Sequence, residues 1–208
     1  MNRVLKGLAA VAVVLTVSIT AKADKEAEKL TIGPASSFPN KQTSEGVTIG
    51  ADVYETGEKV KLAFGKRSPY DSGVLPVLVV IANESDKAIK VDRLNVAYIT
   101  PGGEKVEATP ARELPYLKGA RPPGINPAPL PIPGLPGTSR GKKSPLSDQR
   151  IGEREFSALI IPPHDSASGF FYFQTGHRSN SRLYLSGITV PATGKELFYF
   201  EIPLPAVQ

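Results

Sequence analysis

The residues that could carry chemistry are few, and they lie in stretches that predict turns or loops. The 208-residue chain has no cysteine and only two histidines, His164 and His177. His164 adjoins Asp165, but neighbouring residues on a turn rarely bind one metal ion together, and no third ligand follows at a suitable spacing. The absence of cysteine excludes a thiol nucleophile and a thiol redox motif. We therefore expect no metal site and no cofactor.

Two serine motifs match catalytic patterns by letter alone. Ser139-Arg140-Gly141-Lys142 fits S-x-x-K, and Ser147-Asp148-Gln149 resembles part of a second penicillin-recognising motif. The first motif needs a helix that places its serine and lysine one turn apart, and Gly141 lies in a stretch rich in proline and glycine. No K-T-G follows, and neither a G-x-S-x-G elbow nor a phosphate-cradling glycine loop occurs. We expect a non-catalytic protein, with a secreted hydrolase of unrecognised type as an alternative.

Aromatic residues gather toward the C-terminal end of the chain. They are Phe170, Phe171, Tyr172, Phe173, Tyr184, Phe198, Tyr199 and Phe200. We interpret them as core residues and cross-strand pairs. The alternative is a carbohydrate-binding or carbohydrate-active secreted domain that uses exposed aromatic rings, for which the candidates are Tyr54, Tyr70, Tyr116 and Tyr184.

A proline-rich, basic stretch is the most unusual feature of the sequence. Pro110–Pro145 holds ten of the twenty prolines. It also contains six cationic residues, and Glu113 is its single acidic residue. Each proline fixes φ and removes a donor, so that an extended polyproline II conformation is favoured. We interpret the stretch as either a solvated loop or a docking arm for an envelope protein, a cell-wall polymer or an anionic surface. The candidate binding residues are Arg121, Pro122, Pro123, Ile125, Leu130, Pro131, Ile132, Arg140, Lys142 and Lys143.

Most of the remaining sequence alternates apolar and polar residues, which is the period of a β-strand. Val47–Tyr54 and Lys59–Phe64 flank the predicted turn Glu55–Glu58 and together predict a β-hairpin. The uncharged run Val74–Ala82 predicts a central strand that is covered on both faces. Further strands are predicted at residues 89–92, 94–100, 105–108, 156–161, 169–175, 183–190 and 197–204.

These elements predict an all-β fold, an antiparallel β-sandwich of seven to nine strands with a long Pro/Gly-rich loop. Residues 24–46 are expected to be a polar N-terminal segment in which Pro34, Pro39 and their neighbours break any regular element. Residues 47–208 are expected to form one domain, interrupted by the loop at 110–154. Three C-terminal strands could not bury a core alone.

Two phrases resemble those of exported bacterial immunoglobulin-like modules. Val74–Asp86 is an apolar strand followed by Asn-Glu-Ser-Asp, and Ile161–Phe173 is a proline-led turn followed by small residues, a glycine and an aromatic strand. The resemblance covers roughly residues 47–109 and 155–204 and implies an immunoglobulin-like sandwich. It implies no activity, because such phrases encode strands and turns rather than a site. The proline-rich interruption departs from the compact modules.

The N-terminus has the three parts of a secretory signal peptide. Arg3 and Lys6 precede an uncharged apolar run from Gly7 to Thr20, and Ala21-Lys22-Ala23 predicts cleavage after Ala23. Loss of residues 1–23 would remove three cations and lower the formal net charge from +5 to +2, which does not support nucleic-acid binding. We expect an exported protein, periplasmic, cell-surface or secreted, with no transmembrane span once this segment is removed.

Overall fold

The computed structural model describes residues 30–66, 68–117, 144–197 and 199–207, and this part of the chain is mostly β-structure. Twelve strands form three antiparallel sheets of four strands each, which confirms the all-β prediction. The first sheet has the order β1 (Lys41–Ser44), β2 (Val47–Val53), β3 (Leu75–Asn83), β8 (Asp165–Phe173). The second has the order β11 (Lys195–Glu196), β10 (Thr189–Val190), β4 (Ile89–Lys90), β7 (Ile160–Ile161). The third has the order β12 (Phe200–Pro203), β9 (Arg182–Ser186), β5 (Asn95–Ile99), β6 (Lys105–Glu107).

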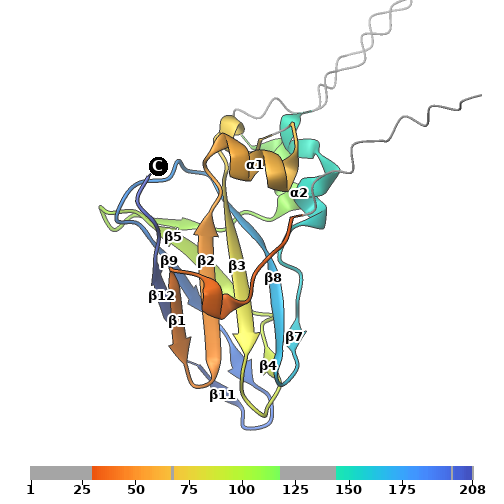
Figure 1. The fold of residues 1–208 in the computed structure, drawn as a ribbon, viewed down its shortest axis with the longest axis vertical. Coiled ribbons are helices and arrows are strands. Elements are labelled where there is room, and N and C mark those ends of the chain that lie inside the picture. Colours follow the sequence, from red (N-terminus) through yellow and green to blue (C-terminus); the bar gives the residue numbers. More distant parts are fainter. Residues whose placement is uncertain (1–29, 67, 118–143, 198, 208) are drawn as a thin grey trace, which may run out of the picture.

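One apolar cluster is shared by all three sheets. Ile49 and Val79 of the first sheet, Ile89 of the second, and Tyr98 and Leu183 of the third are fully buried in it. The first sheet faces the viewer in Figure 1, with β5 and β9 behind it and with β4 and β11 at the end opposite to α1 and α2. Inward-facing residues of the sheets thus meet in a common core, as the alternating sequence pattern requires.

Strand β3 is the central strand that its uncharged sequence predicts. It pairs along its whole length with β8 on one side and from Val77 to Asn83 with β2 on the other, and Val79 lies opposite Ala51 and Gly169. Val77, Val79 and Ile81 face the shared core, whereas Leu78 and Val80 are buried on the opposite face. Both faces of the strand are therefore covered, and this prediction is confirmed.

The outer face of the first sheet is covered by a helical cap. The cap consists of α1 (Gly57–Phe64), α2 (Gln149–Glu153) and the 3-10 helices η1 (Ala35–Ser37), η3 (Ala111–Tyr116) and η4 (Pro145–Ser147). Helices α1 and α2 lie together at one end of the sheet (Figure 1). The cap forms a second apolar cluster with four residues of the sheet, Leu78, Val80, Phe170 and Tyr172.

The predicted hairpin partner Lys59–Phe64 is wrong, because these residues belong to helix α1. Val60, Ala63 and Phe64 are its buried residues, and this i, i+3, i+4 spacing is that of one helical face. In so short a stretch, apolar Val60, Leu62 and Phe64 also alternate as in a strand. The helix ends at Gly65, whose φ of 73° lies in the left-handed region that favours glycine.

The true hairpin partner of β2 precedes it in the chain. Strand β1 lies in the segment predicted to lack regular structure, and that prediction is wrong for Lys41–Ser44. The connecting residues Glu45 and Gly46 both have positive φ, 50° and 76°, as the tight turn of a two-residue hairpin requires. Glu-Gly is a weak turn signal compared with Asn-Gly, so the sequence pattern does not reveal it.

Several predicted strands are shorter than their patterns suggest. The strand predicted at 156–161 is reduced to β7, the one predicted at 183–190 is interrupted between β9 and β10, and the one predicted at 197–204 is reduced to β12. Gly187 lies at one break with φ of 88°, and a Cβ there would lie 2.2 Å from the carbonyl oxygen of Arg93. The chain changes direction at such breaks while the apolar alternation continues, so that periodicity alone does not locate them.

Two predicted segments lie outside the described residues. They are the export segment at residues 1–23 and the centre of the proline-rich loop, residues 118–143. Phe198 also lies outside them. Among the helices of the described part, none has the length and apolar character needed to cross a bilayer.

Candidate functional site

The ten residues predicted to bind a partner all lie between 118 and 143, outside the described residues. They are Arg121, Pro122, Pro123, Ile125, Leu130, Pro131, Ile132, Arg140, Lys142 and Lys143. The structure describes instead the two ends from which this stretch departs, at Leu117 and Ser144. We call residues 110–117 and 144–154 the feet of the insert.

The feet are folded: η3 lies in the first foot, and η4 and α2 lie in the second, within the interruption predicted at 110–154. Pro145 occupies the first turn of η4, where a missing N–H costs nothing. Ser144 Oγ accepts a hydrogen bond from the Leu146 N–H at 3.3 Å, and Asp148 Oδ1 accepts one from the Arg150 N–H at 3.1 Å. These are capping contacts that start η4 and α2.

Apolar side chains fix both feet to the same face of the first sheet. Ala111 and Leu114 of the first foot, and Leu146 and Ile151 of the second, are buried in the second apolar cluster. This cluster also contains Phe64 of α1. The two ends of the insert are therefore held by one hydrophobic cap.

Hydrogen bonds add specific ties between the feet and the fold. Tyr172 Oη donates to the carbonyl oxygen of Ile151 at 2.7 Å. Glu155, which directly follows the second foot, accepts through Oε1 from the Ala111 N–H of the first foot at 2.8 Å, across 44 residues. Within the described residues, no buried side-chain polar atom lacks a hydrogen-bond partner.

Two tyrosines with raised pKa values, Tyr54 and Tyr172, lie in the second apolar cluster. Burial is the main cause that raises the pKa of Tyr54 to about 12, with a smaller contribution from Asp52. Burial also raises the pKa of Tyr172 well above its usual range. Both hydroxyls therefore stay protonated at physiological pH, and Tyr172 acts as a hydrogen-bond donor rather than as a base.

The four candidate sugar-binding tyrosines do not lie on one face. Tyr54 is buried, with its ring edge-on to Phe170 at 4.8 Å, and Tyr70 is half-buried beside both apolar clusters. Tyr116 is 71% exposed at the end of η3. Tyr184 is half-exposed on β9 of the third sheet.

Tyr184 stacks with Tyr199, a residue that the sequence analysis assigned to the core. Their ring centroids are 5.5 Å apart with an interplanar angle of 22°, and Tyr199 is 53% exposed. Lys105 Nζ lies 5.9 Å from the Tyr184 centroid, and Arg182 pairs with Glu201 at 2.6 Å on the neighbouring strands. The stack thus stands among charged side chains on the outer face of the third sheet.

The histidines occupy unrelated environments. His177 is buried, with Nε2 2.8 Å from the carbonyl oxygen of Pro205 and Nδ1 3.2 Å from Tyr98 Oη. Exposed His164 lies 3.1 Å from Asp86 Oδ1. Among the described residues, no group of three or more potential ligands is arranged to hold a metal ion.

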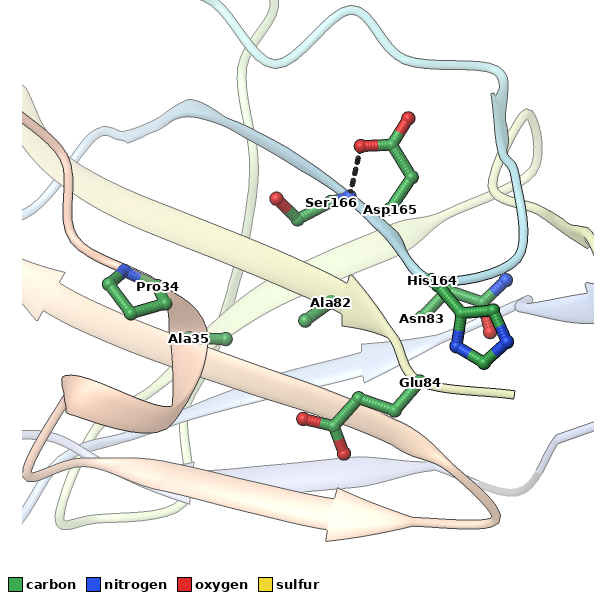
Figure 2. Close-up of a pocket in the computed structure, with 8 residues that line it drawn as sticks. All are labelled: Pro34, Ala35, Ala82, Asn83, Glu84, His164, Asp165 and Ser166. Atoms are coloured by element: carbon green, nitrogen blue, oxygen red, sulfur yellow. Dashed lines mark hydrogen bonds between the residues drawn. The ribbon is translucent and has the colours of Figure 1, made fainter. Parts of the chain in front are cut away.

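His164 borders a shallow hollow of about 310 Å³ on the first sheet, which Pro34 and Ala35 at the start of η1 also line. In Figure 2 its two carboxylates, Glu84 and Asp165, point away from each other, and Asp165 Oδ1 accepts from the Ser166 N–H. Glu84 Oε2 instead accepts from Thr48 Oγ1 at 3.3 Å. A general acid–base pair needs both groups within reach of one reacting atom, and these carboxylates do not converge.

Comparison with known proteins gives only slight likenesses to solved structures. A scan against protein-family models found no match, and a search of curated proteins found none either. The X-ray structure of Northeast Structural Genomics Consortium target SoR45 is similar with a TM-score of 0.34 and 10% identity, over 79% of this chain and 91% of that chain. A functionally unknown protein from Listeria monocytogenes EGD-e is similar with a TM-score of 0.34 and 12% identity, over 80% of this chain and 82% of that chain. Likenesses this slight support no conclusion about fold or function.

Proposed function

We propose that this chain is an exported, non-catalytic interaction module whose proline-rich insert docks to an anionic partner of the cell envelope. The partner would be an envelope protein, a cell-wall polymer or an anionic lipid surface. The main support is the folded base of the insert, because buried Leu114 and Leu146 hold its two ends on one cap. A segment anchored at both ends loses less conformational entropy on binding than a free tail.

The sequence between the anchored ends supports a cationic docking arm. It contains five cations and no acidic residue: Lys118, Arg121, Arg140, Lys142 and Lys143. Prolines favour an extended conformation at low entropic cost, and clustered cations attract an anionic partner through space. Such an attraction between exposed charges weakens as salt concentration rises.

Export and the immunoglobulin-like sandwich belong to the same proposal. The N-terminal sequence of residues 1–23 supports export through a cleavable signal peptide. A two-layer sandwich is supported by the short connections between β4 and β5, β9 and β10, and β11 and β12, which join the second and third sheets into one layer. The apolar cluster that residues of all three sheets share agrees with this arrangement.

The test replaces residues 118–143 by a short Gly/Ser linker. The deletion starts after Leu117 because Leu114 is part of the core, and a longer deletion would unfold the cap. We expect this variant to keep the wild-type melting temperature and to lose retention on isolated envelope material. A variant with the five insert cations changed to Gln should lose most of the binding as well. The matched control changes five exposed cations elsewhere, Lys61, Lys66, Lys87, Arg93 and Arg178.

Two outcomes would contradict the docking arm. One is a deletion variant that binds the envelope material as tightly as the wild type. The other is an equal loss of binding in the insert variant and in the control variant, since overall charge rather than the insert would then be responsible. Retention that does not weaken with salt would exclude the electrostatic part of the proposal.

A second candidate function, carbohydrate binding, is favoured by the Tyr184–Tyr199 stack. An exposed tyrosine ring offers an apolar face to the C–H groups of a sugar, while neighbouring charged side chains can bind its hydroxyls. We expect Tyr199→Ala to weaken binding to soluble polysaccharides in affinity electrophoresis. Tyr116→Ala is the control, because Tyr116 is also exposed but lies in another part of the fold, at the end of η3. Equal mobility of all three proteins at every polysaccharide concentration would exclude this function.

A further inference from the structure

Strand β6 forms an open edge of the third sheet. It pairs with β5 on one side, and within the described residues no strand pairs with its other side. Lys105 and Glu107 are exposed, and their side chains form an ion pair at 2.6 Å. An open edge presents unpaired main-chain groups that can bind another extended segment.

The hydrogen bonds beside β6 show which residues face outward. Two bonds to the β5 side flank the strand, from Ala108 N to Val96 O at 3.0 Å and from Thr100 N to Glu104 O at 2.9 Å. Residues 104, 106 and 108 therefore direct their main-chain groups to β5. Because main-chain direction alternates along a strand, the N–H and C=O groups of Lys105 and Glu107 point away from β5. Thr109 follows the same alternation, because its N–H does not bond to β5 and instead donates to the Tyr172 carbonyl oxygen of β8 at 2.7 Å.

A hollow of about 500 Å³ lies beside this edge. Its walls are residues 104–110 of the strand region together with Glu113, Leu117 and Gln174. This space leaves room next to β6 for a further strand.

The charges on β6 are complementary to those on β6 of a second copy of this chain. In an antiparallel pairing with the two-fold axis at Val106, Lys105 of each copy lies opposite Glu107 of the other. The outward N–H and C=O groups of both residues then form four hydrogen bonds, and opposite charges meet in both pairs. A register that places Lys105 opposite Lys105 would bring like charges together. A two-fold interface requires this kind of self-complementary surface.

We propose that two copies of this chain associate through β6, in an antiparallel pairing centred on Val106, to form a continuous sheet across the dimer. Each copy has one proline-rich insert, so the dimer would carry two. Leu117, where each insert starts, lines the hollow beside β6. Two linked arms bind a repetitive surface more tightly than one. The dimer does not depend on the proposed docking function, since its support comes from β6 alone.

Sedimentation equilibrium of the purified chain tests the pairing. An interface of one short strand is small, so we expect a weak dimer with a dissociation constant of roughly 0.1–1 mM, measured at protein concentrations up to about 1 mM. Lys105→Glu and Glu107→Lys should each raise this constant at least about tenfold, because like charges then face each other. An equimolar mixture of these two variants should associate again, and so should the double variant Lys105→Glu/Glu107→Lys.

Two further variants separate pairing from folding. Glu107→Pro removes one outward N–H at an edge position that tolerates proline, and it should abolish association while the melting temperature stays close to that of the wild type. Lys87→Glu reverses an exposed charge on another part of the surface and should leave association unchanged. A wild type that is monomeric at all these concentrations would overturn the proposal. A dimer insensitive to Lys105→Glu, or a double variant that stays monomeric, would overturn it too.

Discussion

The anchoring of the first foot can be tested by shortening Leu114. This side chain is fully buried in the second apolar cluster, between the feet and the outer face of the first sheet. Leu114→Ala removes three buried carbon atoms at about 0.8 kcal/mol each, or about 2.4 kcal/mol, and the cavity left behind brings the expected loss to about 3 kcal/mol. In a chain of this size such a loss lowers the melting temperature by about 6–12 °C.

Urea denaturation followed by circular dichroism measures this loss. The control is Tyr116→Ala in the same 3-10 helix, where the side chain is 71% exposed and the expected change is below about 0.5 kcal/mol. If Leu114→Ala unfolds at the same urea concentration as the wild type, the foot is not held by the core. The main support for an insert presented from a fixed base would then be lost.

Further predictions concern other parts of the fold. Gly169→Ala should destabilise by about 1–3 kcal/mol in urea denaturation, because its Cβ would lie 2.4 Å from Phe156 Cα on the segment that runs parallel to β8. Asn83→Ala should cost about 2–3 kcal/mol by the same measurement, because it removes the hydrogen bonds that buried Asn83 Nδ2 makes to the backbone carbonyls of Lys87, Ile161 and Pro162. Since the pKa of Tyr54 is raised above 10 by folding, the stability that its neutral form contributes is present below pH 10 and lost as pH rises toward 12. Ultraviolet titration should place its ionisation near pH 12, and Tyr54→Phe should remove that step; an ionisation near pH 10 would contradict its burial.

The sequence predicts a strand correctly where its residue pattern fits no other type of element. Val74–Ala82 is too apolar for any exposed element, and it forms the central strand β3. Val60–Phe64 allows two interpretations, because a short apolar run fits both a strand and one helical turn. The helix is stabilised there by contacts with residues far along the chain, such as Phe170 against Phe64 at 4.9 Å. Local periodicity contains no information about such partners.

The open edge at β6 illustrates a different limit of prediction from the sequence. The pattern of Lys105–Ala108 predicts a short strand, and the structure contains it as Lys105–Glu107. Whether such a strand lies at an edge depends on the order of strands in the sheet, which follows from contacts between distant segments. The stack of Tyr184 on Tyr199 depends on the same order, because β9 and β12 are neighbours although a turn and two short strands separate them in sequence.

The folded feet divide the proline-rich stretch into two parts with different roles. Four apolar residues of the first sheet face outward, and they would be exposed to water without a cover: Leu78, Val80, Phe170 and Tyr172. Residues 110–117 and 144–154 supply part of that cover, and three of the ten prolines, Pro110, Pro115 and Pro145, lie in them. The other seven prolines and five of the six cations lie at 118–143, outside the described residues, and we propose that they serve binding. Substitutions in the feet should therefore change stability first, whereas substitutions at 118–143 should change binding with the melting temperature preserved. A binding defect that always accompanies a stability loss would contradict this division.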